Sequence, residues 1–392
     1  MKKKVSIIFI IICVGFISCV GGVSCFLNDK VVSQLENRTL ATSPLYTQEK
    51  LISGEYFNEY ENYSLDQMVG RDRFVNLLNT SKVIEGKKEI NNIIIGADGV
   101  LLKRGNYDSI EEKVSQGNSE SVANSISKIK ETVDGYGGET IYMHVMHQSE
   151  FYKDKLPTCY QSLSNNFDKY NEALLTDVSK TGAKVVNCNP VLMKHKNEYL
   201  YYKTDHHWTP KGAYYAYREL LNAINENEKL DKYDDMDIVR SNKTFLGSLS
   251  SQIGTTYFQN GDHFEYAVSK NMPNYSRRTS RTNKKQEANN DKLFQDNGTI
   301  YSKYGDIEQT DYAQDTFYTS QINKKNILII GYSYKEALIP YALNNFNKVM
   351  TLDPRKYNGN INDYIKVAKA DYVVVLRDDL WDGNEENVAT IE

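Results

Sequence analysis

The chain has 392 residues and a formal net charge of −4; 40% of its residues are hydrophobic and 25% are charged. These values describe a globular protein that is long enough for one large α/β domain with an appendage. The slight negative charge argues against a nucleic acid partner, because such partners require basic surfaces. The 30 tyrosines would suit a surface that faces sugars, but a bias of composition is the simpler interpretation.

The amino-terminal segment contains the one strongly apolar run, Val5 to Leu27, which follows three lysines at positions 2 to 4. It is long enough to span a bilayer, and the lysines predict that the short amino-terminal side stays in the cytoplasm while the rest lies outside. A cleaved signal peptide has a similar pattern. The string from Phe16 to Cys19 also resembles a lipoprotein processing site. Of these interpretations we favour an uncleaved signal anchor, and a lipoprotein processed at Cys19 is the next alternative.

Three of the five cysteines, Cys13, Cys19 and Cys25, lie inside this apolar run, which leaves Cys159 and Cys188 in the part expected outside. An oxidising compartment would permit these two to form a disulfide. Two separate buried thiols fit the sequence equally well, because it does not show that the two residues are close.

Residues 28–88 form the next predicted segment. Apolar side chains recur there at helical spacing, which predicts amphipathic helices. The residues that carry this pattern are Phe57, Tyr60, Tyr63, Phe74, Leu77 and Leu78. We interpret the segment as a juxtamembrane arm packed on the main domain, which we expect to occupy residues 89–392.

Short β-branched runs alternate with helical stretches from Ile93 onward. The predicted strands are Ile93 to Ile95, Thr140 to Met146, Lys184 to Asn187, Ile327 to Ile330, Lys348 to Leu352 and Tyr372 to Leu376. The predicted helices are Ser119 to Val133, Phe167 to Lys180, Pro210 to Asn225, Lys335 to Phe346 and Ile361 to Ala368. This alternation predicts a flavodoxin-like, three-layer α/β/α domain with a mainly parallel sheet. Ligands of such sheets bind at the carboxyl ends of the strands.

A charged break at residues 226–237 precedes a polar stretch from about 240 to 320. Five basic residues gather in that stretch: Arg277, Arg278, Arg281, Lys284 and Lys285. A groove for an anionic polymer would use such residues, but we favour a solvated insertion within the domain.

The most informative stretch is KTDHHWTPKG at residues 203–212. Thr209 and Pro210 predict the beginning of a helix, as an N-cap oxygen and a preset first turn. In the extended loop before that helix, the side chains of Asp205 and His207 point to the same side of the backbone. A carboxylate beside an imidazole fixes its tautomer and stabilises the imidazolium, as in a triad that activates a nucleophile.

Two other interpretations apply to the same stretch. Asp and His are common where loops enter helices, and Trp208 could simply pin such a loop to the core. Asp205, His206 and His207 are also potential zinc ligands. Three adjacent side chains rarely surround one ion, however, and the sequence has no second ligand pair at a recognisable spacing, so we expect no metal.

A strand that leads into a serine supplies a candidate nucleophile. The largely apolar strand Asn326 to Ile330 is followed by Gly331-Tyr332-Ser333 and a predicted helix. A serine at the carboxyl end of a strand presents its Oγ atom above the sheet, and the next helix directs N–H groups toward a developing oxyanion. Ser333 alone would be interpreted as an N-cap, but with Asp205 and His207 it completes a set of acid, base and nucleophile.

The string Asp205-His206-His207-Trp208 resembles the signature of the DHHW proteins, which belong with the SGNH hydrolase-like domains of the alginate O-acetyltransferase periplasmic proteins. In that group the Asp-x-His element precedes the serine, a permuted order relative to ordinary SGNH esterases. The segment Gly331 to Leu338 resembles the Gly-Asp-Ser-x-x-x-x-Leu block, with Tyr332 in place of the aspartate.

Three further motifs resemble the amino-terminal segments of the family: Glu36-Asn37-Arg38, Asp66-Gln67 and Arg71-Asp72. The resemblance thus runs from about residue 34 to 380. Many relatives have Pro-x-Lys where this chain has His144 to Gln148, and Glu-Arg-Asn where it has Leu376-Arg377-Asp378. We therefore assign no oxyanion or substrate contacts to these positions and interpret His144 and His147 as ordinary strand packing.

The resemblance implies an extracytoplasmic O-acetyltransferase that modifies a cell-surface or secreted polysaccharide. His207 would deprotonate Ser333, and Asp205 would orient His207. Ser333 would then carry the acyl group. It further implies a multi-pass membrane acyltransferase as the acetyl donor, and we expect no bound cofactor. A carbohydrate acetyl esterase would use the same triad with water as acceptor. A non-catalytic polysaccharide-binding or assembly protein is the alternative from another class.

Overall fold

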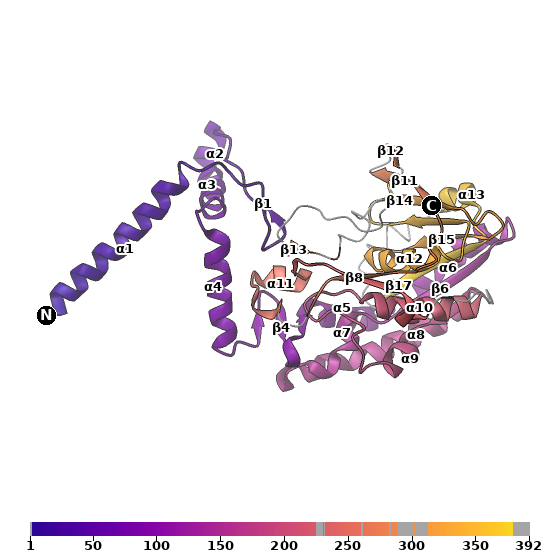
Figure 1. The fold of residues 1–392 in the computed structure, drawn as a ribbon. Coiled ribbons are helices and arrows are strands. Elements are labelled where there is room, and N and C mark those ends of the chain that lie inside the picture. The colour runs from indigo at the N-terminus through magenta and orange to yellow at the C-terminus, as the bar shows by residue number, and fades with distance from the viewer. Residues whose placement is uncertain are drawn as a thin grey trace. The chain divides into compact units, whose positions relative to one another are not determined.

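The computed structural model (Figure 1) describes residues 2–224, 230, 232–259, 262–281, 284–288, 301–302, 304 and 313–378. The chain divides into two compact units, one made of residues 1–91 and 250–258 and the other of residues 92–249 and 259–392. The segment boundaries that we placed after residues 27 and 88 remain a prediction.

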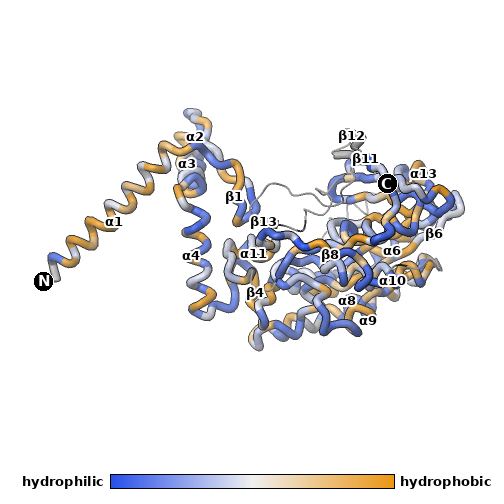
Figure 2. Tube along the Cα trace, viewed as in Figure 1, coloured by the Kyte–Doolittle hydropathy of each residue, from blue (hydrophilic) through white to orange (hydrophobic). Residues whose placement is uncertain are grey.

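The first unit begins with α1 (Lys2–Ser24). Residues Lys4–Ser24 of this helix are long and apolar enough to cross a membrane, and none of the span is buried in the protein. Figure 2 shows α1 as an almost continuous hydrophobic helix. A helix at this position fits either a single-pass anchor or a signal sequence.

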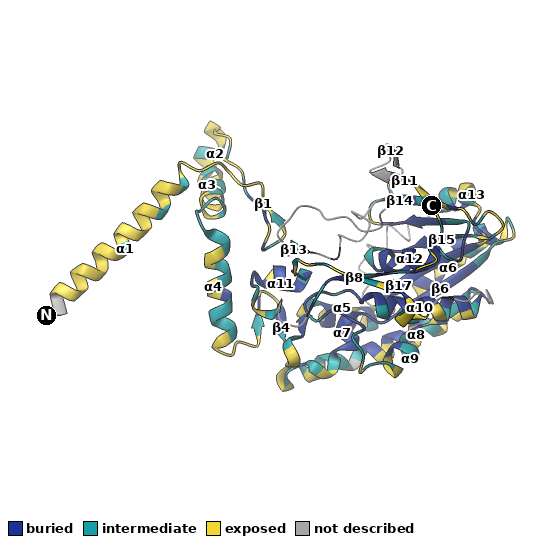
Figure 3. Ribbon diagram, in the orientation of Figure 1, coloured by how far each residue is buried: buried dark blue, intermediate teal, exposed yellow. Residues whose placement is uncertain are grey.

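Three helices follow in the first unit: α2 (Gln48–Ser53), α3 (Glu55–Asp66) and α4 (Arg71–Ile84). Short strands β1 (Val32–Ser33) and β2 (Arg38–Thr39) pair antiparallel before them, and β3 (Glu89–Ile90) comes after them. The expected helices are present, but most of the apolar side chains that predicted them are exposed. Figure 3 accordingly colours α3 and α4 mainly as intermediate or exposed. Phe57 is 62% exposed and Leu77 is 69% exposed. That this arm packs on the main domain remains a prediction.

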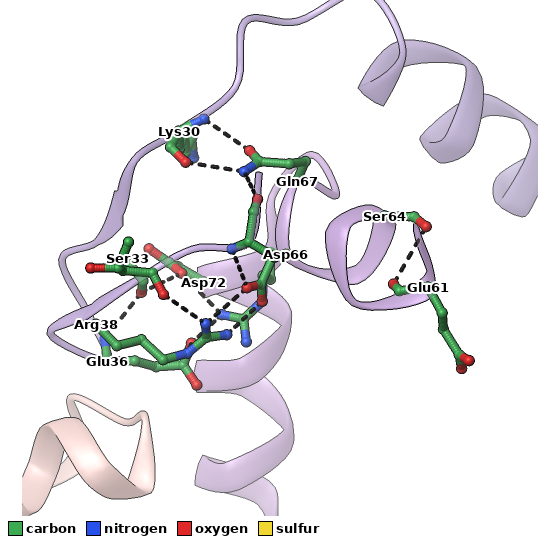
Figure 4. Close-up of polar contacts among 12 residues, drawn as sticks. Lys30, Ser33, Glu36, Arg38, Glu61, Ser64, Asp66, Gln67 and Asp72 are labelled. Carbon is green, nitrogen blue, oxygen red and sulfur yellow. Dashed lines mark hydrogen bonds and ion pairs between the residues drawn. The ribbon is translucent and has the colours of Figure 1, made fainter. Parts of the chain in front are cut away.

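The three amino-terminal motifs meet in one network of polar contacts, which Figure 4 shows. Arg38 donates to both carboxylate oxygens of Asp66, at 2.8 and 2.5 Å. Arg71 contacts Glu36 and lies 3.3 Å from Asp66. The hydrogen bond from Arg38 lowers the pKa of Asp66 to about 2. Gln67 accepts from the backbone of Lys30 at 2.8 Å, so the segment after α1 is fixed to the junction of α3 and α4.

The core of the second unit is an eight-stranded sheet with the order β12-β11-β14-β16-β15-β17-β6-β7. Its strands are β6 (Glu139–Val145), β7 (Lys184–Asn187), β11 (Tyr275–Arg281), β12 (Lys284–Ala288), β14 (Gln314–Thr319), β15 (Asn326–Ile330), β16 (Lys348–Leu352) and β17 (Tyr372–Asp378). The strands from β16 to β7 run parallel, and β14, β11 and β12 extend that sheet antiparallel. The predicted mainly parallel sheet is therefore confirmed.

Helices cover this sheet. They are α5 (Arg104–Gln116), α6 (Ser119–Asp134), α7 (Gln148–Phe151), α8 (Asn166–Ser179), α9 (Asn189–Lys194), α10 (Pro210–Ala223), α12 (Ile339–Ala342) and α13 (Ile361–Ala368), and α11 (Ser248–Ile253) begins in this unit. Helices α6 and α13 contact each other, whereas α10 contacts β7 and the turn after β15. Strand β17 is buried over its whole length, as expected for a strand with both faces covered.

The polar stretch after residue 240 departs from our prediction. Strands β11 and β14 join the central sheet, and the remaining strands of the stretch are β8 (Asp237–Arg240), β9 (Thr244–Phe245), β10 (Glu265–Val268) and β13 (Tyr301–Ser302). Arg277 of β11 and Asp315 of β14 form a buried ion pair at 2.7 Å. These two charged residues of the stretch therefore lie inside the fold and are not solvated. Residues 289–300 lie outside the described residues, as do residues 226–229 and 231 of the charged break.

Two smaller expectations were also wrong. Ile93–Ile95 forms β4, but β4 pairs antiparallel with β5 (Leu101–Lys103) and is not in the central sheet. The helix expected from Lys335 to Phe346 is a 3₁₀ turn, η7 (Ser333–Leu338), followed by the short helix α12. Pro340 has no N–H group to continue a helical ladder, so a new turn begins there.

The two cysteines beyond the apolar run are not paired. Cys159 is exposed and Cys188 is buried, and both are free thiols.

Candidate active site

The loop that carries Asp205 and His207 folds back on the preceding segment. Tyr201 and Trp208 form an isolated antiparallel bridge, and the N–H of Tyr202 donates to the carbonyl of His207 at 3.1 Å. Thr209 then caps α10 by accepting from the N–H of Gly212 at 3.3 Å, as its sequence position predicts. The two sides of the loop are thus fixed just before and just after the histidines.

Asp262, a buried carboxylate that we did not predict, holds the backbone just before this loop. Asp262 accepts hydrogen bonds from the backbone N–H groups of Lys203 and Thr204, at 2.9 and 2.6 Å. It also accepts from the hydroxyl groups of Thr204 and Tyr199, at 2.6 and 2.7 Å. With four donors on one carboxylate, the backbone that leads into Asp205 has little freedom to move.

The serine lies at the carboxyl end of β15, where Gly331 passes close to β17. A Cβ atom on Gly331 would lie only 3.1 Å from the carbonyl oxygen of Leu376, so a side chain there would push the turn outward. Two hydrogen bonds tie the turn to the histidine loop. Trp208 Nε1 donates to the carbonyl of Tyr334 at 3.1 Å, and the Tyr334 hydroxyl donates to the carbonyl of His206. The tryptophan therefore joins the two halves of the site rather than only pinning its own loop.

The three residues that the sequence singled out lie in one chain of hydrogen bonds. Asp205 Oδ1 lies 2.6 Å from His207 Nδ1, and His207 Nε2 lies 2.6 Å from Ser333 Oγ. The second oxygen of Asp205 accepts from the N–H of Ser248 at 2.7 Å. Both Asp205 and His207 are buried. The geometry is that of an acid, a base and a nucleophile in series.

The electrostatics keep Asp205 ionised. Burial alone would raise its pKa, but the charge and hydrogen bond of His207, together with His206 and the Ser248 N–H, hold the pKa well below its usual range. A charged carboxylate at this position can hold the proton of His207 on Nδ1, which leaves Nε2 able to accept a proton from Ser333.

The His207 ring lies between two other rings. The Tyr304 ring stacks on it with centroids 3.6 Å apart and an interplanar angle of 1°. The second ring is that of His206, whose centroid lies 3.8 Å from the His207 centroid at an interplanar angle of 38°. Tyr304 is buried. The imidazole therefore cannot rotate away from Ser333 unless its neighbours move, and sequence reasoning missed Tyr304 because it lies in a polar stretch far along the chain.

His206 has a different environment from His207. Its Nδ1 lies 2.9 Å from Ser248 Oγ, and its ring faces the His147 ring at 6.0 Å and 10°. Its side chain is 32% exposed. Burial among these rings and the charge of His207 lower the pKa of His206 to about 3. His206 is therefore a neutral, partly exposed ring beside His207.

The metal interpretation can be tested against the same distances. Donor atoms of Asp205, His206 and His207 all lie within 4.8 Å of one another. Asp205 and His207 are hydrogen-bonded to each other, however, and His206 to Ser248. This pairing suits proton transfer to Ser333 better than it suits coordination of one ion.

The residues at which this chain departs from its relatives are placed as follows. His144 is buried in β6 and stacks on Tyr142, as strand packing predicts. His147 lies beyond the end of β6, and its Nδ1 accepts from the N–H of Ser149 to cap α7, so strand packing does not account for it. Arg377 and Asp378 are buried at the end of β17.

A mainly parallel sheet with an Asp-x-His loop that precedes a serine after a strand defines the class of SGNH hydrolase-like proteins with permuted order. A family profile described as "SGNH hydrolase-like domain, acetyltransferase AlgX" matches residues 93–300, and the chain belongs to this family. The matched range contains Asp205 and His207 and ends before Ser333. No curated protein matches the chain in sequence.

Solved structures share the fold. A DHHW family protein from Eubacterium siraeum is 20% identical, with 69% of this chain and 88% of that chain covered and a TM-score of 0.58. PatB1 from Bacillus cereus is 18% identical, with 76% and 99% covered and a TM-score of 0.57. PatB1 with a sulfonyl adduct, at 18% identity, covers 75% of this chain and 96% of its own, with a TM-score of 0.56.

Proposed function

We propose that this protein is an extracytoplasmic O-acetyltransferase that modifies a cell-surface or secreted polysaccharide through Ser333, His207 and Asp205. The observation that carries the proposal is the unbroken series of contacts from Asp205 to His207 to Ser333, with 2.6 Å at each step between side chains. Membership of a family described by an acetyltransferase supports the type of reaction.

The reaction divides into two acyl transfers. As Ser333 Oγ attacks the carbonyl carbon of an acetyl donor, its proton passes to His207 Nε2. The bond to the donor's leaving group then breaks, and His207 returns the proton to that group. In the second transfer a sugar hydroxyl gives its proton to His207 while its oxygen attacks the acetyl carbon. Ser333 leaves with the proton, and the sugar carries the acetyl ester.

Backbone N–H groups are proposed to stabilise the oxyanion of each tetrahedral intermediate. Ser333 is the first residue of η7, and the N–H groups at the start of such a turn have no partner within it. Removal of a comparable donor costs about 10²- to 10³-fold in rate. The close packing of Gly331 on β17 would keep this turn in a fixed position.

A sulfonyl adduct on a protein of similar fold supports a reactive nucleophile in this fold. PatB1 from Bacillus cereus carries a sulfonyl adduct, and sulfonyl reagents react with activated nucleophiles. For this chain we propose that the same fold presents Ser333 to acyl donors. The natural donor would be acetyl carried by a multi-pass membrane acyltransferase, which the membrane-spanning length of α1 would bring within reach.

The acceptor distinguishes this proposal from its alternatives. Full-length protein in detergent is incubated with p-nitrophenyl acetate and a polysaccharide, and acetyl esters on the polymer are measured beside free acetate. Acetylated polymer is expected from the wild-type protein and not from Ser333→Ala. Release of acetate alone by the wild type would identify an esterase. The absence of both products would favour a binding or assembly protein.

The topology has its own test. The three lysines at the beginning of α1 are proposed to hold its amino end in the cytoplasm and to place the second unit outside. Protease added to intact protoplasts is expected to digest the second unit. Protection of the second unit in intact protoplasts, with digestion after lysis, would contradict an extracytoplasmic enzyme.

A further inference from the structure

Helix α4 is held to its own unit by polar side chains. The Asn79 side chain is buried, and its amide donates to the carbonyl of Ile253 at 2.6 Å. The Asn76 amide donates to the hydroxyl of Thr256 at 3.1 Å, and its oxygen accepts from the N–H of the same residue at 3.1 Å. All of these residues belong to the first unit. The face of α4 that carries Asn76 and Asn79 is therefore its inner face.

Close packing at Gly254 fixes this orientation of α4. Gly254 has a φ of +73°, and a Cβ atom there would lie 2.7 Å from Val75 Cγ1 and 3.5 Å from Asn79 Nδ2. A rotation of α4 about its axis would break the hydrogen bonds of Asn76 and Asn79 and would separate Val75 from Gly254. These contacts therefore decide where the remaining side chains of the helix point.

The opposite face of α4 is apolar and exposed to solvent. Its members recur at the spacing of one helical face, at three, four and ten residues after the first. They are Phe74, Leu77, Leu78 and Ile84, which are 40%, 69%, 56% and 69% exposed. We call these four residues the outer stripe. A helix of a water-soluble protein normally buries its apolar face and exposes its polar face, so the outer stripe marks a surface that another phase or molecule covers.

The outer stripe begins against the candidate membrane span. The N–H of Val69, just before α4, donates to the hydroxyl oxygen of Ser24, the last residue of the span, at 2.9 Å. The rings of Phe16, inside the span, and Phe74 meet edge to face with centroids 6.1 Å apart. The apolar surface of α1 therefore continues into the outer stripe, and α4 begins where α1 would leave the bilayer.

Basic residues accompany the stripe. Arg73 in the first turn of α4 is exposed, and so are Lys87 and Lys88 just after the helix. Glu85 is the one exposed acidic residue between Arg73 and Lys88. Apolar side chains with basic neighbours are the combination by which helices bind the surface of a bilayer that contains anionic lipids.

We propose that the outer stripe of α4 lies in the interface of the same bilayer that α1 spans, among the lipid headgroups and the outer ends of the acyl chains. The apolar face of such a helix is buried roughly 5–10 Å into this boundary. The bilayer would then hold the first unit at two places, so the unit could not swing freely about the end of α1. The inference requires α1 to span the membrane, as the proposed topology does, but it does not depend on the chemistry at Ser333.

Photo-cross-linking tests this contact. Benzoylphenylalanine is placed at Leu77 or Leu78 of the full-length protein, which is reconstituted into vesicles of equal parts phosphatidylcholine and phosphatidylglycerol, irradiated, digested and examined by mass spectrometry. Two positions serve as references: Ile11, 64% exposed within the span, and Ile322, 77% exposed in the second unit. We expect phospholipid adducts at Leu77 and Leu78 with a yield within about threefold of that at Ile11 and at least about fivefold above that at Ile322.

The lipid composition tests the basic residues. In vesicles of phosphatidylcholine alone, the adduct yield at Leu77 is expected to fall about twofold or more, because Arg73, Lys87 and Lys88 lose their anionic partners. An equal yield in both kinds of vesicle would overturn the contribution of these charges.

The outcomes separate the bilayer from other covers of the stripe. Adducts at Ile11, with none above the Ile322 level at Leu77 and Leu78, would overturn the inference, and so would cross-links from the stripe to another part of the chain or to a second copy. The labelled proteins are also irradiated in intact expressing cells, where an adduct with a different protein in place of lipid would overturn it as well. Absence of lipid adducts at Ile11 would instead overturn the membrane span and the proposed topology.

Discussion

His207 Nε2 lies 2.6 Å from Ser333 Oγ although the two residues are 126 positions apart in the chain. The contact exists because the loop of residues 205–208 and the turn after β15 share two hydrogen bonds through Trp208 and Tyr334.

The two histidines should differ in importance. His207→Gln removes the base between Asp205 and Ser333, so hydrolysis of p-nitrophenyl acetate is expected to fall about 10³-fold or more. His206→Gln loses a single hydrogen bond to Ser248, and a fall of about tenfold or less is expected. Because the pKa of His206 is about 3, its replacement should leave the shape of the pH–rate profile above pH 5 unchanged. A larger loss in His206→Gln than in His207→Gln would show that His206, and not His207, is the base.

Asp205→Asn should slow the reaction without removing the nucleophile. The amide cannot stabilise the imidazolium, and it favours the wrong tautomer of His207, so kcat is expected to fall roughly 10²- to 10⁴-fold. Because Ser333 remains in place, slow labelling by an activated ester should continue. A rate within about twofold of the wild type would show that the 2.6 Å contact has no role in catalysis.

Tyr304 is predicted to position His207 through ring stacking at 3.6 Å. Tyr304→Ala should lower kcat by up to about tenfold, since an aromatic pair contributes roughly 0.5–1.5 kcal/mol beyond burial. Tyr304→Phe preserves the ring and should restore kcat to within about twofold. Tyr318→Ala, at a partly exposed tyrosine of β14, serves as the control. If Phe fails to rescue the rate, stacking is not the relevant contact.

The ion network of the first unit should give acid-dependent stability. The pKa of Asp66 is about 2 in the folded protein and 3.8 ordinarily, so its contribution is complete above about pH 4 and is lost as the pH falls toward 2. Asp66→Asn should therefore lower the Tm at pH 7, and the difference from the wild type should shrink between pH 4 and pH 2. Asp168→Asn, which changes an exposed carboxylate paired with Lys153, should have little effect at either pH.

Sequence patterns predicted the parallel part of the fold closely, for a physical reason. Strands β7 and β16 and helix α13 have the bounds that their apolar periodicity predicts. Runs of β-branched residues between turn signals leave few alternatives when both faces of a strand are buried. By contrast, β11 and β14 were missed because Arg277 and Asp315 neutralise each other inside the sheet, a contact that only the folded chain creates.

In the candidate site, too, some residues could be predicted from local sequence patterns and others could not. Asp205, His207 and Ser333 could be proposed from the sequence because each occupies a local position that suggests such a role, a loop before a helix or the end of a strand, and the structure brings them into contact. Ser248, Asp262 and Tyr304 reach the site from distant loops, and no local pattern distinguishes them from other polar residues. The prediction of one continuous helix after Ser333 was wrong for a local reason, because Pro340 begins a new helical turn.

The most direct test of the account is the covalent state of Ser333 during turnover. Full-length protein is mixed with p-nitrophenyl acetate, quenched in acid, digested and examined by mass spectrometry. One acetyl group is expected on the peptide that contains Ser333, formed with the burst of p-nitrophenol and lost as acceptor is added. Ser333→Ala should show neither the acetylated peptide nor the burst. A burst in Ser333→Ala, or acetylation of another residue at the same rate, would contradict the proposed mechanism.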